Sequence, residues 1–166
     1  SLGDYFDPAL IDEFEKETGI KVVLDNFDTN EEMYPVMTKG TVKYDVICAS
    51  DYMIQKLLKK KLLAKLDYAK LPNYENIDQR YMKLASKFDK NNEYAIPHTW
   101  GVLGIMYNTK KIAKGEINSW NDLLNRKYDQ QIVMPDSVRD NFAIALKAKG
   151  YSINTKKETE LKKATE

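Results

Sequence analysis

Residues 93–108 have the sequence EYAIPHTWGVLGIMYN, which contains the longest apolar run of the chain. β-Branched and aromatic residues, which favour extended backbone, are frequent in this run. Gly101 and Gly104 interrupt it at a spacing that suits a bend or a close backbone approach rather than a turn. We therefore predict two strand pieces that connect two lobes.

The segments on either side of this run alternate between predicted strands and helices. Capping residues mark helix starts: Asp7 precedes Pro8, and Thr29 with Glu32 forms a capping box. Pro35 should kink or shorten the second of these helices, because it has no amide hydrogen to donate. Such alternation favours βαβ units and a mainly parallel sheet. Besides 93–108, the predicted strands are 20–24, 44–49 and 131–134, and helices are predicted to start near residues 8, 30, 51, 77, 120, 138 and 155.

Composition and charge give no support for several kinds of partner. The chain has 26 basic and 25 acidic residues, so its net charge of +1 gives no argument for a nucleic-acid or membrane partner. No apolar run approaches the ~20 residues that a membrane-spanning helix needs. Cys48 is the single cysteine, and we expect it to pack as a small hydrophobe. The absence of a leader and the last predicted helix, cut at Glu166, lead us to expect a fragment.

The sequence contains no recognisable catalytic device. His98 has no Cys, His or carboxylate neighbour at metal-ligand spacing, so no zinc site is predicted. Patterns for a nucleophile elbow, a phosphate-binding loop and a dinucleotide-binding turn are also missing. We therefore predict a protein that is not an enzyme and that uses no metal and no cofactor.

The run Tyr-x-Ile-Pro-x-x-Trp-Gly at 94–101, followed by an apolar strand that ends on Asn108, resembles a known family. It is similar to the inter-lobe crossover of bacterial spermidine/putrescine-binding proteins, which are the extracytoplasmic solute-binding components of ABC importers. The resemblance covers nearly the whole chain but only about half of a family member, without its first strand and C-terminal half. Other segments that match in order are 18–22, 30–34, 44–46, 50–52, 119–123 and 136–140.

The resemblance implies a two-lobed α/β protein of the periplasmic-binding-protein type II fold, with a mainly parallel sheet in each lobe. Residues 1–102 would form most of the first lobe, and residues 103–166 an incomplete second lobe. It also implies that a polyamine is captured between closing lobes and that a membrane permease is the partner. We expect a monomer without nucleic acid. Its place would be the periplasm or the outer face of the cell membrane, in soluble, lipid-anchored or permease-fused form.

Three short segments carry the ligand residues that the resemblance implies in the first and second lobes. Asp4 would neutralise an ammonium group, and Tyr5 would lie against the methylene chain or the cation. In the turn that follows strand 44–49, Ser50 and Tyr52 would line the cleft. Open α/β sheets present their ligand crevices at such strand ends. Each residue also has a structural interpretation: a loop position for the first two, a helix cap for Ser50 and core packing for Tyr52.

In the second lobe, the resemblance implies two acidic positions that grip one amine end of the ligand: Asp140 matches the second of them, and Ser137 stands at the first. Ser137 departs from the Asp of the spermidine-preferring pattern, so the preferred polyamine stays open. A helix N-cap with an acidic residue three positions later explains the same pair without a ligand. Trp100 is either a cation–π wall or a packing residue at the bend.

Two groups of alternatives remain at this stage. A relative on the same fold would bind iron, thiamine or an organophosphonate instead of a polyamine. The same fold also serves as the effector domain of transcription regulators and as a scaffold for enzymes, since fold does not fix function. A regulator would need a helix-turn-helix segment, and an enzyme would need catalytic residues that these 166 residues lack.

Overall fold

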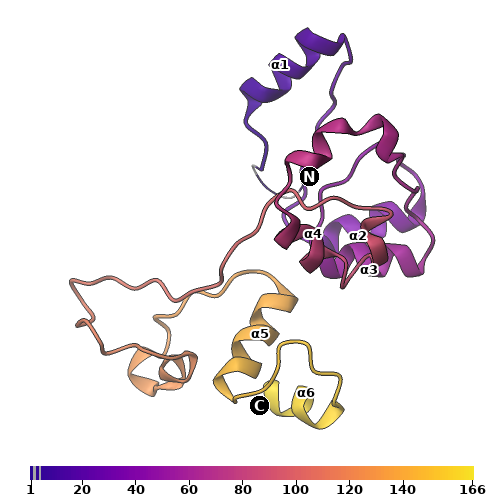
Figure 1. Ribbon diagram of the computed structural model, residues 1–166. Helices are drawn as coiled ribbons and strands as arrows, with labels where there is room; N and C mark the ends of the chain where they lie inside the picture. Colours follow the sequence, from indigo (N-terminus) through magenta and orange to yellow (C-terminus); the bar gives the residue numbers. More distant parts are fainter. Residues whose placement is uncertain (2, 4) are drawn as a thin grey trace. The chain divides into compact units, whose positions relative to one another are not determined.

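The computed structural model describes residues 1, 3 and 5–166, and Figure 1 shows its helices joined by long extended segments. The chain divides into two compact units, Ser1–Trp100 and Gly101–Glu166. The division therefore falls inside the run at 93–108, whereas the sequence prediction placed it after residue 102. That each unit is part of one lobe stays a prediction.

Unit 1, Ser1–Trp100, contains four α-helices and three 3-10 turns in its described part. Local capping chemistry explains where its helices begin and end. The Asp7 carboxylate accepts the N–H of Ala9 (2.9 Å) at the start of the first helix, and Gly19 ends that helix at a left-handed φ of 72°. The helices are α1 (Pro8–Thr18), α2 (Asn30–Lys39), α3 (Asp51–Lys59) and α4 (Gln79–Ala85), and the 3-10 turns are Tyr68–Lys70, Pro72–Asn76 and Lys90–Asn92.

Helix α2 shows how far the capping prediction holds. The Thr29 hydroxyl accepts the N–H of Glu32 (3.1 Å), as predicted, but the Glu32 carboxylate accepts the N–H of Asp28 instead of Thr29 (3.1 Å). The helix continues through Pro35 and ends at Gly40, whose φ is 66°. The predicted end of this helix is therefore confirmed.

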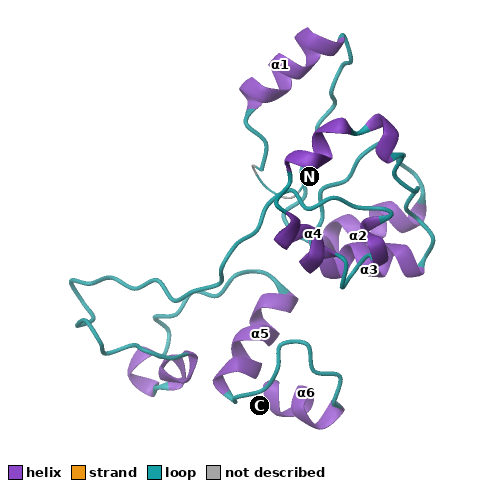
Figure 2. Cartoon of the chain, in the orientation of Figure 1, coloured by secondary structure: helices purple, strands orange, loops and turns teal. Residues whose placement is uncertain are grey.

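The predicted strands are absent as strands from the described residues (Figure 2). Segments 20–24, 44–49, 131–134 and both pieces of 93–108 have no sheet ladder, so the mainly parallel sheet predicted for each lobe is not confirmed. One isolated bridge forms at Phe27, whose N–H donates to the Ser1 carbonyl (2.9 Å) and whose carbonyl accepts the Gly3 N–H (3.2 Å). A strand requires a neighbour that takes up its backbone groups, and β-propensity alone does not supply one.

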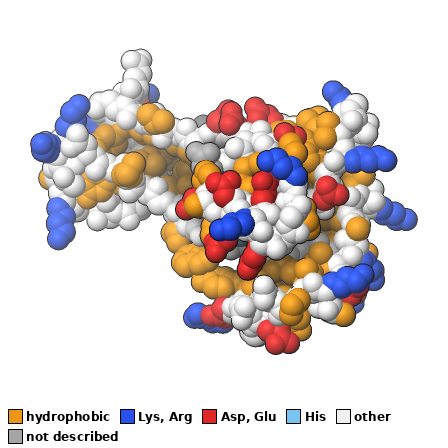
Figure 3. Space-filling model, turned by 90° about the horizontal axis from the view of Figure 1, so that it is seen from above, with side chains coloured by type: hydrophobic (Ala, Val, Ile, Leu, Met, Phe, Trp, Pro, Cys, Tyr) orange, Lys and Arg blue, Asp and Glu red, His pale blue; other side chains and the backbone are white. Residues whose placement is uncertain are grey.

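The extended segments leave apolar side chains in contact with solvent. Val23, Val46, Met106 and Val133 are 84%, 85%, 97% and 96% exposed, and Figure 3 shows broad apolar areas on the displayed face. Single exposed apolar residues are normal, but many of them on extended segments indicate surfaces that usually pack against another part of a protein. These segments have the side chains of buried strands without the neighbours of buried strands.

The core of unit 1 lies between α2 and α3. Met33, Met53 and Leu57 are at most 1% exposed. Burying one such side chain contributes about 1.5–3 kcal/mol, which makes this small cluster the main apolar support of the unit. Partly buried residues that pack against it are Phe27, Tyr34, Met37, Ile47, Ala49, Tyr52 and Leu63. Cys48 is half-buried near this region, and burial raises the pKa of its thiol.

Unit 2, Gly101–Glu166, is built around α5 (Val138–Ala148), which contacts both α6 (Glu158–Ala164) and the 3-10 turn Trp120–Leu124. A second turn, Arg126–Tyr128, is held by Glu116. The Glu116 carboxylate pairs with Lys127 (2.5 Å) and accepts the Tyr128 hydroxyl (2.8 Å). Hydrogen bonds from Lys127 and Tyr128 lower the pKa of Glu116. No helix of the described residues has the length and apolar character needed to cross a membrane.

We predict that Leu57→Ala lowers the free energy of unfolding of unit 1 by about 2–5 kcal/mol, because a cavity opens under α2 and α3. Leu84→Ala is the matched control, since Leu84 is 51% exposed on α4. Urea unfolding followed by circular dichroism measures both. Equal losses in the two variants would contradict the assignment of the core.

Candidate functional site

Two reciprocal hydrogen bonds join the starts of α2 and α3. The Asn30 side-chain amide donates to the Ser50 hydroxyl (2.9 Å), and the Ser50 N–H donates to the Asn30 side-chain carbonyl (3.1 Å). Asn30 is only 7% exposed, so these bonds satisfy polar groups that would otherwise be buried without partners. The pair fixes the two helix N-termini side by side above the apolar core.

Ser50 occupies the N-cap position of α3, but its hydroxyl makes no capping hydrogen bond. Its backbone carbonyl instead accepts the N–H groups of Met53 (2.9 Å) and Ile54 (3.0 Å). Ser50 is therefore the N-cap residue of α3 through its backbone carbonyl and not through its hydroxyl, and its predicted role in the cleft stays a prediction. The Ser50 hydroxyl oxygen has two acceptor sites, and the Asn30 side-chain amide uses one of them.

Tyr52 lies in the first turn of α3 and combines packing with a polar contact. Its ring packs against the core of Met33, Met53 and Leu57. Its hydroxyl donates to the carboxylate of Glu31 in the first turn of α2 (3.2 Å). A carboxylate and an aromatic ring thus meet at the surface, next to the Ser50 hydroxyl.

Glu31 is the candidate residue that the sequence analysis missed. The segment Thr29–Glu32 has the pattern of a capping box, which directed attention to the first and last of its residues. Glu31 becomes a candidate only through its contact with Tyr52, which lies twenty-one residues later in the sequence. The sequence carried only a weak signal for Glu31, because acidic residues are common in the first turn of a helix.

Of the two predicted N-terminal ligand residues, Asp4 and Tyr5, the structure describes only Tyr5. Asp4 lies outside the described residues, so its predicted role stays a prediction. Tyr5 is 53% exposed. Its neighbour Phe6 stacks on His98, with ring centroids 5.0 Å apart and planes inclined by 19°. The start of the chain therefore reaches the crossover run within unit 1.

Trp100 ends unit 1 and stacks on Tyr81 of α4, with ring centroids 5.8 Å apart and planes inclined by 25°. It is still 66% exposed. The two interpretations offered by the sequence therefore both retain support: the ring packs against α4 and also has a face open to solvent.

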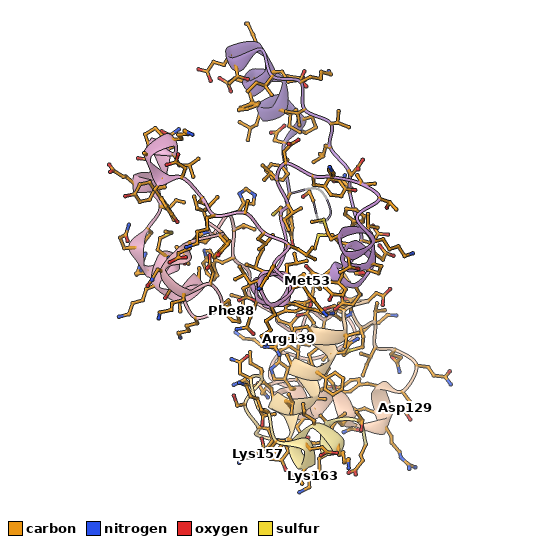
Figure 4. The ribbon with its side chains drawn as sticks, turned by 90° about the vertical axis from the view of Figure 1, so that its right-hand side faces the viewer. Met53, Phe88, Asp129, Arg139, Lys157 and Lys163 are labelled. Carbon is orange, nitrogen blue, oxygen red and sulfur yellow. The ribbon has the colours of Figure 1, made fainter. Side chains whose placement is uncertain are left out.

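The second-lobe candidates belong to unit 2 and form the start of α5. The Ser137 hydroxyl accepts the N–H of Asp140 (3.3 Å), so Ser137 caps the helix. Asp140 is half-buried in the first turn, where the helix dipole favours a negative charge. The Arg139 guanidinium donates to the Asn154 side-chain oxygen (2.5 Å) and lies at the N-terminal end of α5 (Figure 4).

A metal site finds no support in the described part of the chain, where no group of three or more His, Cys, Asp or Glu side chains is placed to hold an ion. His98, the single histidine, stacks on Phe6. The arrangement instead offers carboxylates, hydroxyls and aromatic faces, which suit organic cations with apolar spacers.

Comparison with known proteins identifies the family. The model of the family described as bacterial extracellular solute-binding protein matches residues 9–166. The chain belongs to this family.

Similar proteins agree on the kind of solute. The spermidine/putrescine-binding periplasmic protein of Salmonella typhimurium is 36% identical over 164 residues, which are 98% of this chain and 47% of that protein. The putrescine-binding periplasmic protein SpuD of Pseudomonas aeruginosa is 36% identical over 173 residues, with 98% and 47% covered. The chain thus spans about half the length of the relatives it matches.

Solved structures of similar proteins support the solute-binding-protein fold. A putative spermidine/putrescine ABC transporter from Listeria monocytogenes is 40% identical with a TM-score of 0.91, over 98% of this chain and 50% of that chain. The TpPotD lipoprotein of Treponema pallidum is 30% identical with a TM-score of 0.87, over 96% and 50%. The predicted solute-binding-protein fold is confirmed at this level.

We predict that Asn30→Ala lowers the free energy of unfolding by about 1–3 kcal/mol, because it leaves the Ser50 N–H without its partner. Asn26→Ala is the control, since Asn26 is exposed. Thermal unfolding of both variants makes the comparison. If Asn30→Ala is as stable as Asn26→Ala, the pair does not hold the two helices together.

Proposed function

We propose that this chain is part of the extracytoplasmic solute-binding component of an ABC importer for polyamines. The observation that supports it most is the 36% identity, over 98% of the chain, to a protein named for spermidine and putrescine binding. The chemistry of the candidate site supports the same ligand class. The proposal describes capture and delivery of a solute, not catalysis.

A linear polyamine has two requirements, and the starts of α2 and α3 carry groups suited to them. Each ammonium group needs a carboxylate or an aromatic face, and the methylenes between them need flat apolar walls. Glu31 provides the carboxylate, and Tyr52 provides the ring, to which it is hydrogen-bonded (3.2 Å). A carboxylate about 4 Å from an ammonium contributes roughly 4 kcal/mol at an effective dielectric near 20, before desolvation. The ring adds about 0.5–2 kcal/mol.

Asp140 supplies the corresponding carboxylate from unit 2, at the N-terminal end of α5. The Ser137 hydroxyl accepts the Asp140 N–H (3.3 Å) and so holds the residue that carries this carboxylate at the start of the helix. We therefore propose that Ser137 orients the first turn of α5 and that Asp140 meets the ligand. Asp4 and Tyr5 complete the proposal on the unit 1 side.

Closure of two lobes accounts for affinity and for signalling. Micromolar binding needs about −8 kcal/mol net, after the cost of lost translational and rotational freedom. The contacts that one lobe provides would give little net binding free energy once that cost is subtracted. A ligand that bridges both lobes stabilises the closed form, and a membrane permease that prefers the closed form then receives only loaded protein.

We also propose that the exposed extended segments are strands of two mainly parallel sheets in the full-length protein, which has the two-lobed type II arrangement. The TM-score of 0.91 to the Listeria structure supports this, because the matched backbone is half of a longer chain, whose other half could supply the neighbouring strands. The exposed Val23, Val46 and Val133 side chains support it as well. They would become buried once neighbouring strands take up the backbone groups.

The proposed location is the periplasm or the outer face of the cell membrane. Two relatives are named periplasmic proteins, and the Treponema relative is named a lipoprotein. The net charge of +1 supports a partner other than nucleic acid. We propose that the protein acts as a monomer that docks on its permease.

We predict that the full-length protein binds spermidine or putrescine with micromolar or tighter affinity, and that Asp140→Ala weakens binding at least about tenfold, which is 1.4 kcal/mol. The reason is loss of the carboxylate that faces the ligand from unit 2. Isothermal titration calorimetry measures both. Asp129→Ala is the control, because Asp129 is an exposed acidic residue of the same unit.

The outcomes separate the parts of the proposal. Tight polyamine binding that is insensitive to Asp140→Ala keeps the ligand class and leaves Asp140 as a helix-capping residue. Binding of ferric ion or thiamine without binding of either polyamine overturns the ligand class.

A further inference from the structure

A buried carboxylate lies just before the run that connects the two units. Asp89 is 3% exposed and sits between α4 and the 3-10 turn Lys90–Asn92. One of its carboxylate oxygens accepts two backbone N–H groups, from Tyr94 (2.7 Å) and Ala95 (2.9 Å). Hydrogen bonds to a charged acceptor are short and strong, and these two distances agree with that.

The position of Asp89 makes this contact unusual. An aspartate before a helical turn normally caps the N–H groups inside that turn. Here the Asp89 side chain makes no capping bond to Lys90–Asn92. Its backbone carbonyl accepts the Asn92 N–H (2.9 Å), as the carbonyl of an N-cap residue normally does, while its carboxylate accepts N–H groups beyond the turn.

The turn itself is held from several sides. Asn92 is 7% exposed, and its side-chain amide donates to the Met82 carbonyl of α4 (3.0 Å). The Tyr68 hydroxyl donates to the Asn92 carbonyl (2.6 Å), and the Leu66 N–H donates to the Glu93 carbonyl (2.8 Å).

Backbone strain adds to the evidence that this turn is specified. Asn91 and Asn92 have φ values of 62° and 51°, in the left-handed region that is uncommon for residues other than glycine. Such conformations persist where surrounding contacts fix them. Asp89 thus binds the backbone of Tyr94 and Ala95 to a rigid turn.

We infer that Asp89 is a positioning residue for solute capture: it fixes the direction in which the crossover run leaves unit 1. Tyr94 and Ala95 are the first residues of that run, and Gly101 begins unit 2. Two consecutive N–H groups bound to one buried oxygen fix the peptide planes on both sides of Tyr94. The stacks of His98 on Phe6 and of Trp100 on Tyr81 hold the next residues on unit 1, so any bend between the units lies beyond Trp100, and the Asp89 anchor sets where this held stretch begins.

The consequence for ligand binding rests on the proposed function. A bend that starts at a fixed point limits the range of open conformations, which lowers the entropic cost of closing on a ligand. Without the Asp89 anchor, the open form would sample more orientations. Ligand affinity would fall although no ligand contact is removed.

The test compares Asp89→Ala and Asp89→Asn in the full-length protein. Asparagine retains a carbonyl oxygen that can accept from the same N–H groups, so it should rescue much of the effect. Asp67→Ala is the control: Asp67 caps the turn Tyr68–Lys70 by accepting the Ala69 N–H (3.2 Å) from an exposed position.

Three measurements are made on each variant. Hydrogen exchange reports the amides of Tyr94 and Ala95. Electron–electron distance measurements between spin labels at Lys59→Cys and Lys163→Cys, in a Cys48→Ala background, report the spread of orientations between the units. Titration calorimetry reports polyamine affinity. Lys59 and Lys163 are exposed positions on α3 and α6.

We expect Asp89→Ala to accelerate exchange at Tyr94 and Ala95 at least about tenfold. It should also broaden the ligand-free distance distribution and weaken polyamine binding several-fold, with Asp89→Asn intermediate and Asp67→Ala unchanged. Faster exchange with an unchanged distance distribution would overturn the inference and leave Asp89 as a local structural residue. If the wild-type protein binds no polyamine, the proposed function fails, and the exchange and distance results still decide the role of Asp89.

Discussion

The paired hydrogen bonds between Asn30 and Ser50 are the contact on which the candidate site depends. They connect two helices whose first turns carry Glu31 and Tyr52, residues that are far apart along the chain. Beneath them lies a core of only a few fully buried side chains. A small apolar core tolerates sliding of one helix against another, whereas two directional bonds from a buried amide define a single register.

Much of the local structure follows from residue chemistry that acts over a few positions. Asp7, Thr29 and Ser137 cap helices as predicted, and Gly19 and Gly40 end them, because caps and left-handed glycines depend only on neighbours in sequence. Whether a sheet forms could not be predicted from neighbours in sequence. Residues 44–49 have the composition of a buried strand, yet a strand also needs a partner from elsewhere in the fold.

The candidate site shows the same limit. Resemblance to the family pointed to Ser50 and Tyr52, and the structure places Ser50 against Asn30 and Tyr52 against Glu31. Glu31 was missed, because its role appears only when two distant helix starts meet. Ser50 was open to a capping interpretation from sequence, and only its bond with Asn30 shows how the hydroxyl is used.

Spermidine bound to the full-length protein, seen in a crystal structure, is the measurement that tests the central claim most directly. The account predicts electron density for an extended polyamine between two lobes, with one ammonium group beside Tyr52 and Glu31 and another beside Asp140. The intervening methylenes should lie on aromatic faces. An ordered polyamine that touches neither the start of α3 nor the start of α5 would contradict the account.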